Sequence, residues 1–434
     1  MKKEMPAVKR AAATGIKMCA VLLIAICLGT ALLYAAYLLP TVSMSRHLEE
    51  SIPVFQTEGS YPRQVSWCSS TLDNFTDALM LLTAAYDGGE PTMDKAMNLY
   101  FETVEMTPDF NPVNSVLSYG SKNIELSTRT YTRYWEGYLI FLKPLLSVMN
   151  YQQIRILNQI FQMAILFLLV FLMERSGNGR FILPLLLSLG LLPVIVNAQS
   201  LTYSDVYYLS VGGSCILILK WEKWKNSEKL LLFFLILGIL TSYLDFLTYP
   251  LVSFGIPACL CFCIKEENDF LSSLKSFIRL GFAWSFGYAG MWAGKWVCAS
   301  IFTSKNAIQE GLSSVLFRSG AMLEDAVPIS LSDTILRNVG EWVKNPFFIL
   351  FWLFCVVTLT LIMKRDCFES MAKYLIFLII AFMPFAWYIV VRNHSYVHYF
   401  FTYKELVVFA FAIMSFFVKS MSTGQRGEGG AKRG

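Results

Sequence analysis

Charged side chains are scarce in this chain, and their scarcity excludes most classes of soluble protein. Asp, Glu, Lys and Arg make up 15% of the 434 residues, whereas hydrophobic residues make up 55%. Soluble globular proteins carry about 25% charged residues. Apolar runs of about 20 residues, the length that crosses a bilayer as a helix, recur along the chain. The composition therefore predicts a polytopic membrane protein, and the net charge of +5 gives no reason to expect a nucleic-acid partner.

The sequence also lacks the motifs of several enzyme and metal-site classes. It contains no phosphate-binding Gly-rich loop, no dinucleotide fingerprint and no internal repeat. Its ten cysteines lie mostly in apolar runs, and only Cys68 occupies a clearly polar segment, so no disulfide framework is indicated. No cofactor is expected, and a divalent metal at the histidines described below is a less favoured alternative.

Ten apolar runs predict an all-α integral membrane protein with about ten transmembrane helices. The basic N-terminus at 1–17 precedes an uncleaved first helix at 18–40. Lys and Arg concentrate in the short loops on one side, which places both termini in the cytoplasm. A run at 138–149 is too short to span and is expected to be juxtamembrane or re-entrant. The other runs lie at 156–173, 181–197, 203–219, 230–245, 246–264, 281–302, 346–363, 374–391 and 404–418.

These runs divide the rest of the chain into loops and helical groups. The largest loop comes directly after the first helix and is expected to carry juxtamembrane helices on the outer side. The predicted parts are this outer loop at 41–150, transmembrane helices 2–7 at 151–302, a second outer loop at 303–345, transmembrane helices 8–10 at 346–419 with an outer loop at 392–403, and a cytoplasmic tail at 420–434.

Acidic residues mark the large outer loop. The segment Leu72–Leu82 is expected to form a short amphipathic helix on the membrane surface, with Asp73 and Asp77 on one face. A carboxylate there can take a proton from an acceptor hydroxyl, so both are candidate catalytic residues. The alternative is that both are solvated and that Asp73 only caps the helix. Glu49 and Glu50 compete with Asp73 for the same role.

Further charged residues lie near the predicted outer ends of the membrane helices. Ionisable groups are unfavourable inside a bilayer, so those present commonly belong to a functional site. Arg129 and Arg133 suit a lipid-linked phosphate or an interfacial anchor. Lys295 either binds an anion or extends its long side chain to the interface. The other candidate substrate-binding residues are Glu136, Asp205, Asp245, Arg392, His394 and His398.

The segment Arg392–Glu405 is a polar, aromatic stretch between two apolar runs. It holds two of the three histidines, and His394 and His398 share one face if the segment is helical. A connecting loop needs only to be short and soluble, so this chemistry favours a binding site. Interfacial anchoring is the alternative, because Tyr, Trp and His commonly lie at the membrane–water boundary.

The order of these features resembles the GT-C superfamily of integral-membrane glycosyltransferases. The resemblance rests on about ten spans, the large outer loop after the first helix, Asp73-Asn74 with Asp77, the stretch Arg133–Tyr138 before Lys143-Pro144, and the polar loop Arg392–Lys404. It implies a polyprenyl-phosphate-linked sugar as donor and a glycan or lipid as acceptor, in a bacterial inner membrane. It also implies Asp73 as general base. Its donor-phosphate contacts would be Arg392, His394 and Lys295.

Three other functions compete with glycosyl transfer, for which a single displacement with inversion at the sugar is expected. One is that of a non-catalytic scaffold in an envelope complex. An O-antigen-type polysaccharide polymerase or ligase would also have many spans, but such proteins usually place their largest outer loop late. A transporter or flippase commonly contains inverted repeats, and none is found here. The expected partners are therefore membrane lipids, the lipid-linked sugar and its acceptor.

Overall fold

The computed structural model describes residues 7–104, 110–120, 126–265, 269–322, 327–364 and 371–431. Nearly all regular structure in these residues is helical, which confirms the all-α class. The exception is an antiparallel hairpin of β1 (Tyr100–Val104) and β2 (Leu126–Thr130), in which Glu102 pairs with Thr128. The eight cysteines that the structure places are all free.

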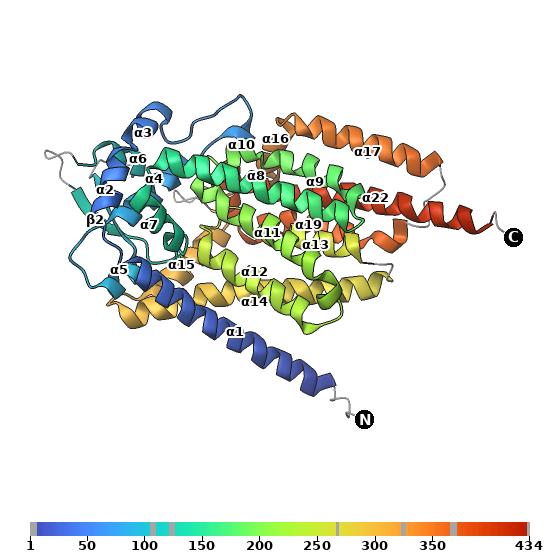
Figure 1. Cartoon of the computed structure of the whole chain (residues 1–434), viewed down its shortest axis with the longest axis horizontal. Coiled ribbons are helices and arrows are strands. Elements are labelled where there is room, and N and C mark those ends of the chain that lie inside the picture. Colours follow the sequence, from blue (N-terminus) through green and yellow to red (C-terminus); the bar gives the residue numbers. More distant parts are fainter. Residues whose placement is uncertain are drawn as a thin grey trace.

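The expected large outer loop folds into a cap at one end of the molecule (Figure 1). One expectation about this cap is wrong, because α4 is buried inside the cap and is not an amphipathic helix with an exposed polar face. Both Asp73 and Asp77 are buried, and so is every residue from Ala78 to Ala85. The physical reason is the run Ala78–Leu82, which places apolar side chains on all faces of the helix. The cap contains α2 (Val42–Glu49), α3 (Ile52–Glu58), α4 (Asn74–Ala85), α5 (Thr92–Asn98), α6 (Pro112–Leu117) and α7 (Leu139–Val148).

A bundle of helices, most of them long, extends away from the cap, and each of the ten apolar runs overlaps one of them (Figure 1). The helix α1 begins, and α22 ends, at the end of the bundle opposite the cap. The bundle consists of α1 (Ala7–Ala36), α8 (Tyr151–Arg175), α9 (Ile182–Ser188), α11 (Leu201–Trp224), α12 (Glu228–Leu244), α13 (Leu251–Ile264), α14 (Phe270–Phe302), α17 (Phe347–Lys364), α19 (Ile376–Val390) and α22 (Leu406–Ala431).

Some of these helices are long and apolar enough to cross a membrane. Within the described residues there are three, at Ala11–Ala36, Tyr151–Arg175 and Tyr399–Met421. A fourth candidate is the pair Leu331–Val343 and Phe347–Met363, which bends by 89° at its break. Other apolar helices, including α13 and α19, are shorter. Length and composition thus support membrane association, and the ten-span arrangement stays a prediction.

Close contact between α12 and α14 fixes the middle of the bundle. A Cβ atom added at Gly238 would lie 2.0 Å from the Trp284 carbonyl oxygen, and one at Gly287 would lie 2.3 Å from that of Leu235. Only glycine fits at these two positions, as is common where membrane helices pack backbone to backbone. The contact holds the end of α12 at a fixed position beside α14.

The second and third expected outer loops are helical and pack together. The second contains α15 (Ala307–Ser319) and α16 (Leu331–Val343), and the third contains α20 (Arg392–Val397) and α21 (Tyr399–Thr402). Both α15 and α16 contact α20. The Asn393 backbone N–H also donates a hydrogen bond to the Gly320 carbonyl at 3.1 Å. The histidine segment is therefore held by the preceding outer loop.

Candidate functional site

Five carboxylates meet where the cap joins the bundle, and we call them the acidic cluster. They come from four separate parts of the chain, and each is close enough to another for their charges to interact. The acidic cluster consists of Asp73 and Asp77 of α4, Asp205 of α11, Asp245 after α12 and Glu405 before α22.

Asp73 is the N-cap of α4. Its carboxylate accepts hydrogen bonds from the Thr76 backbone N–H at 3.0 Å and from the Thr76 hydroxyl at 2.8 Å. Its own N–H donates to the Ser200 hydroxyl at 2.9 Å, which joins α4 to the start of α11. Burial raises the pKa of Asp73 to about 7, Asp77 adds to the rise, and Thr76 and Lys404 oppose it. Asp73 therefore has a structural role together with a proton affinity that suits a base near neutral pH.

Asp77 holds the start of α11 in place. It accepts hydrogen bonds from the backbone N–H groups of Leu201 at 2.8 Å and Thr202 at 3.0 Å. The Tyr151 hydroxyl donates a third at 2.5 Å. Burial raises the pKa of Asp77 to about 6, although Tyr151 and the nearby Arg155 favour the charged form. These contacts show that Asp77 caps α11, a helix distant from it in sequence. The catalytic role of Asp77 stays a prediction.

Asp245 and Glu405 also accept hydrogen bonds from backbone N–H groups. The Asp245 carboxylate accepts from the Thr248 N–H at 3.0 and 3.2 Å and from the Thr248 hydroxyl. Glu405 accepts from the Leu251 N–H at the start of α13, at 3.2 Å. Four of the five carboxylates thus stabilise turns or helix ends.

Asp205 differs from the other members of the acidic cluster. It lies in the second turn of α11, it is only half-buried, and no described residue donates a hydrogen bond to its side chain. Its charged neighbours are Asp245 and Asp77. A carboxylate has about four lone-pair sites, and those of Asp205 are not used within the described chain. Asp205 is therefore the member best able to accept a hydrogen bond from a ligand.

His394 and His398 lie beside the acidic cluster, as neutral side chains. The Leu247 carbonyl can only accept, so His394 Nε2 donates to it, at 2.7 Å, and Nδ1 accepts from Arg318. Burial, His398 and Arg318 together hold the pKa of His394 well below its usual range. Burial and Arg318 lower the pKa of His398 to about 4, and its ring stacks on Phe401 at 5.2 Å. His394 therefore positions Arg318 and is not itself a cation.

Two cations that were not among the predicted site residues face this region. Arg318 of α15 lies 6.0 Å above the Tyr134 ring, and its charge and that of Asp245 both act on Tyr134. Lys404 is buried, lies 4.4 Å above the Tyr203 ring and acts electrostatically on Asp73. Arg318 lies in the last turn of α15, outside both the apolar runs and the histidine segment, so the sequence gives little signal for it. Lys404 lies within the histidine segment, so the sequence gives a stronger signal for it than for Arg318.

Several buried polar atoms near Arg318 and Asp245 have no hydrogen-bond partner within the described residues. They are the Tyr288 hydroxyl, Trp292 Nε1 and Glu405 Oε2. The charges of Asp245, Glu405 and Arg318 all act on Tyr288, which places it among them. Buried polar atoms in native proteins are nearly always hydrogen-bonded to protein, to water or to a ligand. These atoms are therefore able to bond to water or to a polar ligand.

Two of the predicted cations, Arg129 and Arg392, lie outside this region, and a third, Arg133, lies at its edge beside Trp292 and Arg318. The Arg133 guanidinium donates to the Ser314 hydroxyl at 3.2 Å and lies 3.9 Å from a Glu310 carboxylate oxygen, so it joins the cap to α15. Arg129 is exposed on β2, 5.1 Å above the Phe110 ring. Arg392 is half-buried and has no polar contact within the described chain.

Lys295 and Glu136 form a separate buried pair. The Lys295 ammonium group is fully buried and donates to the Met97 carbonyl at 2.8 Å, which joins α14 to α5. Glu136 accepts from the Tyr138 hydroxyl at 2.9 Å. Burial raises the pKa of Glu136 to about 8, although Tyr138 and the Lys295 charge oppose the rise. This pair connects the cap to the bundle.

A further buried cation supports the first turn of α4. Arg155 of α8 donates to Glu58 at 2.9 Å and to the Asn74 side-chain oxygen at 2.7 Å. The competing pair Glu49 and Glu50 is exposed, and Glu50 lies 3.8 Å from Arg46. Asp73 is thus supported by packing from α8, whereas Glu49 and Glu50 lie on the surface of the cap.

No group of three or more His, Cys, Asp or Glu residues suited to a metal ion occurs within the described ranges. Comparison with protein-family models, with curated proteins and with solved structures found no match to this chain. The function must therefore be argued from the site itself.

Proposed function

We propose that this protein is a membrane glycosyltransferase that moves a sugar from a polyprenyl-phosphate donor to a glycan or lipid acceptor. One observation carries the proposal. The acidic cluster and Arg318 surround buried polar atoms of Tyr288, Trp292 and Glu405 that have no partner within the described chain. A ligand with hydroxyl and phosphate groups could satisfy both donors and acceptors of this kind.

The proposed orientation places the cap outside a bacterial cytoplasmic membrane and both termini inside. Each of the ten bundle helices would form all or part of one span. Lysines and arginines concentrate in the short loops at the end of the bundle opposite the cap, as cytoplasmic loops require. The acidic cluster would then lie near the outer surface of the membrane, where a lipid-linked sugar and an extracytoplasmic acceptor can both reach it.

The donor phosphate is assigned to Arg318 and Lys404. As the bond from sugar to phosphate breaks, negative charge grows on the departing polyprenyl phosphate. Cations held in a buried site stabilise that charge more effectively than cations in water. The Arg318 side chain is held by His394, which is itself fixed by the Leu247 carbonyl.

Asp205 is the first choice for the base, and Asp73 is the second. The base accepts the proton of the acceptor hydroxyl while the hydroxyl oxygen forms a bond to the anomeric carbon. Polyprenyl phosphate leaves from the opposite side, so the anomeric centre inverts. Asp205 has unused acceptor sites and is half-buried, whereas Asp73 accepts two hydrogen bonds from Thr76.

The test is a transfer assay with the purified full chain in lipid nanodiscs. A panel of polyprenyl-phosphate-linked sugars is supplied with lipid and glycan acceptors, and release of polyprenyl phosphate is measured by mass spectrometry. We expect release with at least one donor, coupled to sugar on an acceptor. Movement of intact donor across a vesicle membrane without cleavage would instead identify a flippase and overturn the proposal.

A further inference from the structure

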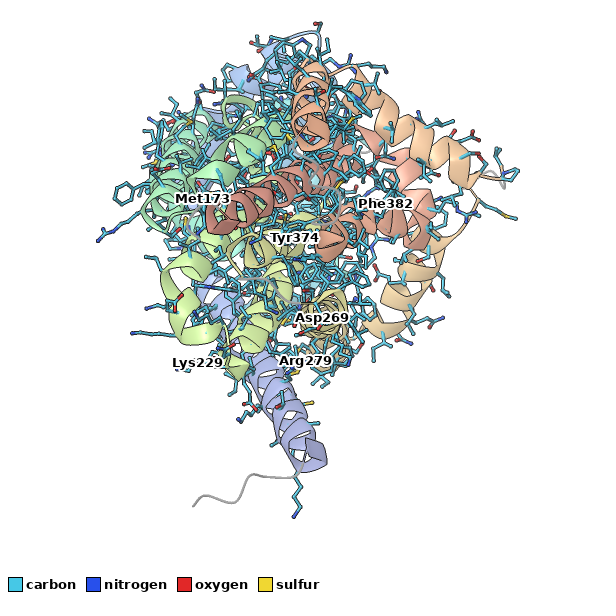
Figure 2. All side chains as sticks on the ribbon, turned by 90° about the vertical axis from the view of Figure 1, so that its right-hand side faces the viewer. Met173, Lys229, Asp269, Arg279, Tyr374 and Phe382 are labelled. Atoms are coloured by element: carbon cyan, nitrogen blue, oxygen red, sulfur yellow. The ribbon has the colours of Figure 1, made fainter. Side chains whose placement is uncertain are left out.

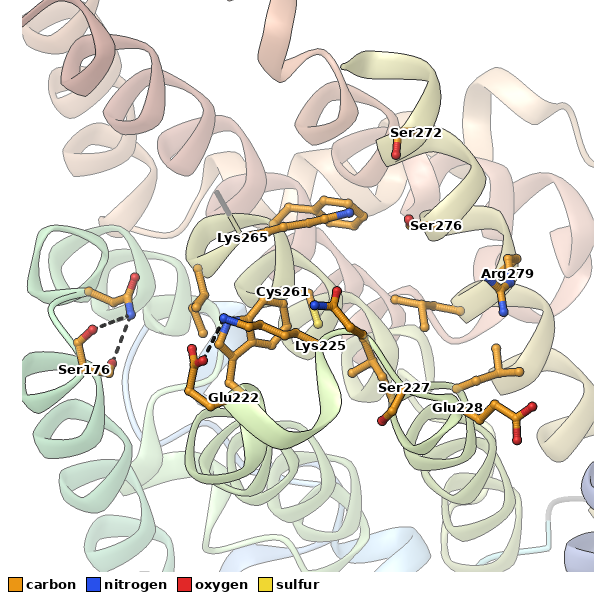
Figure 3. A pocket seen from close by; sticks show the side chains of 18 residues that line it. Ser176, Glu222, Lys225, Ser227, Glu228, Cys261, Lys265, Ser272, Ser276 and Arg279 are labelled. Atoms are coloured by element: carbon orange, nitrogen blue, oxygen red, sulfur yellow. Dashed lines mark hydrogen bonds and ion pairs between the residues drawn. The ribbon is translucent and has the colours of Figure 1, made fainter. Parts of the chain in front are cut away.

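A cavity lies at the end of the bundle opposite the acidic cluster (Figure 3). Its volume is about 900 Å³, within the range of about 300–1,000 Å³ of small-molecule sites. The walls come from the C-terminal ends of α11 and α13 and the N-terminal parts of α12 and α14. Neither the transfer reaction nor the acidic cluster uses this cavity.

One face of α14 supplies the polar wall. Ser272, Ser276 and Arg279 follow a spacing of four and then three residues, so they share a helix face toward the cavity (Figure 3). Arg279 has no hydrogen-bond or ion-pair partner within the described residues. Two hydroxyls and a guanidinium in this arrangement match the oxygens of a phosphate group.

The carboxylates in the lining are already paired. Glu222 lies 2.7 Å from the Lys225 ammonium group, and Glu228 lies 2.6 Å from that of Lys17 on α1. The Thr14 hydroxyl also donates to Glu228 at 2.9 Å. With these charges balanced, Arg279 gives the polar wall a positive charge, and a second basic residue, Lys265, lies in the lining.

The lining also has an apolar part, beside further polar side chains such as Asn178 and Asn226. The apolar part consists of Trp221, Leu230, Leu231, Phe262, Ile264 and Leu280. A free phosphate ion would use only the hydroxyls and cations, and would leave this surface in contact with water. A ligand with an anionic head and an apolar body would contact both kinds of lining.

We propose that this cavity binds the phosphate headgroup of an anionic phospholipid, with the upper acyl chains against the apolar lining. The phosphate accepts hydrogen bonds from Arg279, Ser272 and Ser276. Lys229 and Arg279 both lie at the face of the molecule that Figure 2 turns toward the viewer. Basic residues at a membrane surface attract anionic lipids, which favours this occupant. The proposal does not rest on the transfer activity.

The experiment is native mass spectrometry of the full chain released from nanodiscs that contain equal phosphatidylglycerol and phosphatidylcholine. We expect wild type to retain phosphatidylglycerol preferentially. Arg279→Gln should retain about five-fold less, the loss expected for one cation beside an anionic headgroup. Ser276→Phe, which fills the cavity and keeps its charge, should lose retention as well. Lys229→Gln removes a cation from the same end outside the cavity and is the matched control.

Two results would overturn the proposal. The first is equal retention of phosphatidylglycerol by wild type, Ser276→Phe and Arg279→Gln. The second is a site that binds inorganic phosphate and not lipid. In that case millimolar phosphate would displace phosphatidylglycerol completely, and phosphatidylglycerol would fail to displace bound phosphate.

Discussion

The acidic cluster and the Glu136–Lys295 pair are both buried and ionisable, yet their polar atoms are used differently. Lys295 donates to the Met97 carbonyl, and Glu136, whose pKa burial raises to about 8, accepts from Tyr138 with one oxygen while its other oxygen has no partner within the described residues. In the cluster, Asp205 is half-buried with no described donor, and the Tyr288 hydroxyl has no partner. Burial of a charge alone therefore does not identify a site. The more specific sign is the grouping of several unpartnered polar atoms with a half-buried carboxylate and a cation, because the Glu136–Lys295 pair has a single such atom.

The largest expected effect comes from Asp205→Asn. The variant keeps the shape of the side chain but cannot accept a proton, so transfer should fall by about 10²–10⁴-fold. Thermal unfolding in detergent should be unchanged or slightly raised, because the repulsion from Asp245 and Asp77 is removed. Asp333→Asn, at an exposed carboxylate of α16, is the control. Full activity of Asp205→Asn, with loss in Asp73→Asn, would move the base to Asp73.

Arg318→Gln should have the next largest effect. It removes the cation assigned to the departing phosphate and should lower kcat by about 100-fold, as loss of one charge-stabilising donor commonly does. Arg133→Gln is the comparison, since Arg133 contacts Ser314 and Glu310 and should change kcat by less than about ten-fold. Equal losses in the two variants, measured in the same transfer assay, would contradict the assignment.

Lys295→Met tests the Glu136–Lys295 pair, which we expect to stabilise the fold and not to take part in transfer. The change leaves the buried Met97 carbonyl without its donor, so the free energy of unfolding should fall by about 1–3 kcal/mol. The kcat of the folded fraction should stay near that of wild type. Thermal unfolding together with active-site titration separates the two quantities. A large loss of kcat with normal stability would instead bring Lys295 into the catalytic machinery.

His394→Ala should give a smaller effect than loss of Arg318. The guanidinium would keep its charge but lose the imidazole that orients it. We expect KM for the donor to rise by about ten-fold with little change in kcat. The split between the two constants is the readout, measured over a range of donor concentrations. An unchanged KM would reduce His394 to a packing residue.

The last prediction concerns how the free energy of unfolding depends on pH through Asp73. Its pKa of about 7 in the folded chain lies above the usual 3.8, so its contribution to stability is complete below pH 4. That contribution is lost as pH rises toward 7. Asp73→Asn keeps a capping side chain and removes the titration. Relative to the variant, wild type should lose at most about 1.4 kcal/mol per pH unit over this interval, measured by unfolding at several pH values. Parallel pH profiles would contradict the burial of an ionisable Asp73.

The sequence predicted the helices well because apolar runs are local signals. It also predicted that Asp205, Asp245 and His394 belong near one region, since each follows or precedes an apolar run on the same side. It could not predict that Asp77 caps α11, because that hydrogen bond joins Asp77 to Leu201. For the same reason it could not predict the partner of Lys295, which was expected either to bind an anion or to extend to the interface and in fact donates to the Met97 carbonyl in the cap.

The central claim is tested most directly by a structure of the protein with a bound polyprenyl-phosphate sugar. We predict that the phosphate lies within hydrogen-bonding distance of Arg318, and that the sugar faces the Asp205 carboxylate and the Tyr288 hydroxyl. A phosphate bound at Arg129 on the surface of the cap, or a sugar distant from the acidic cluster, would contradict the proposal.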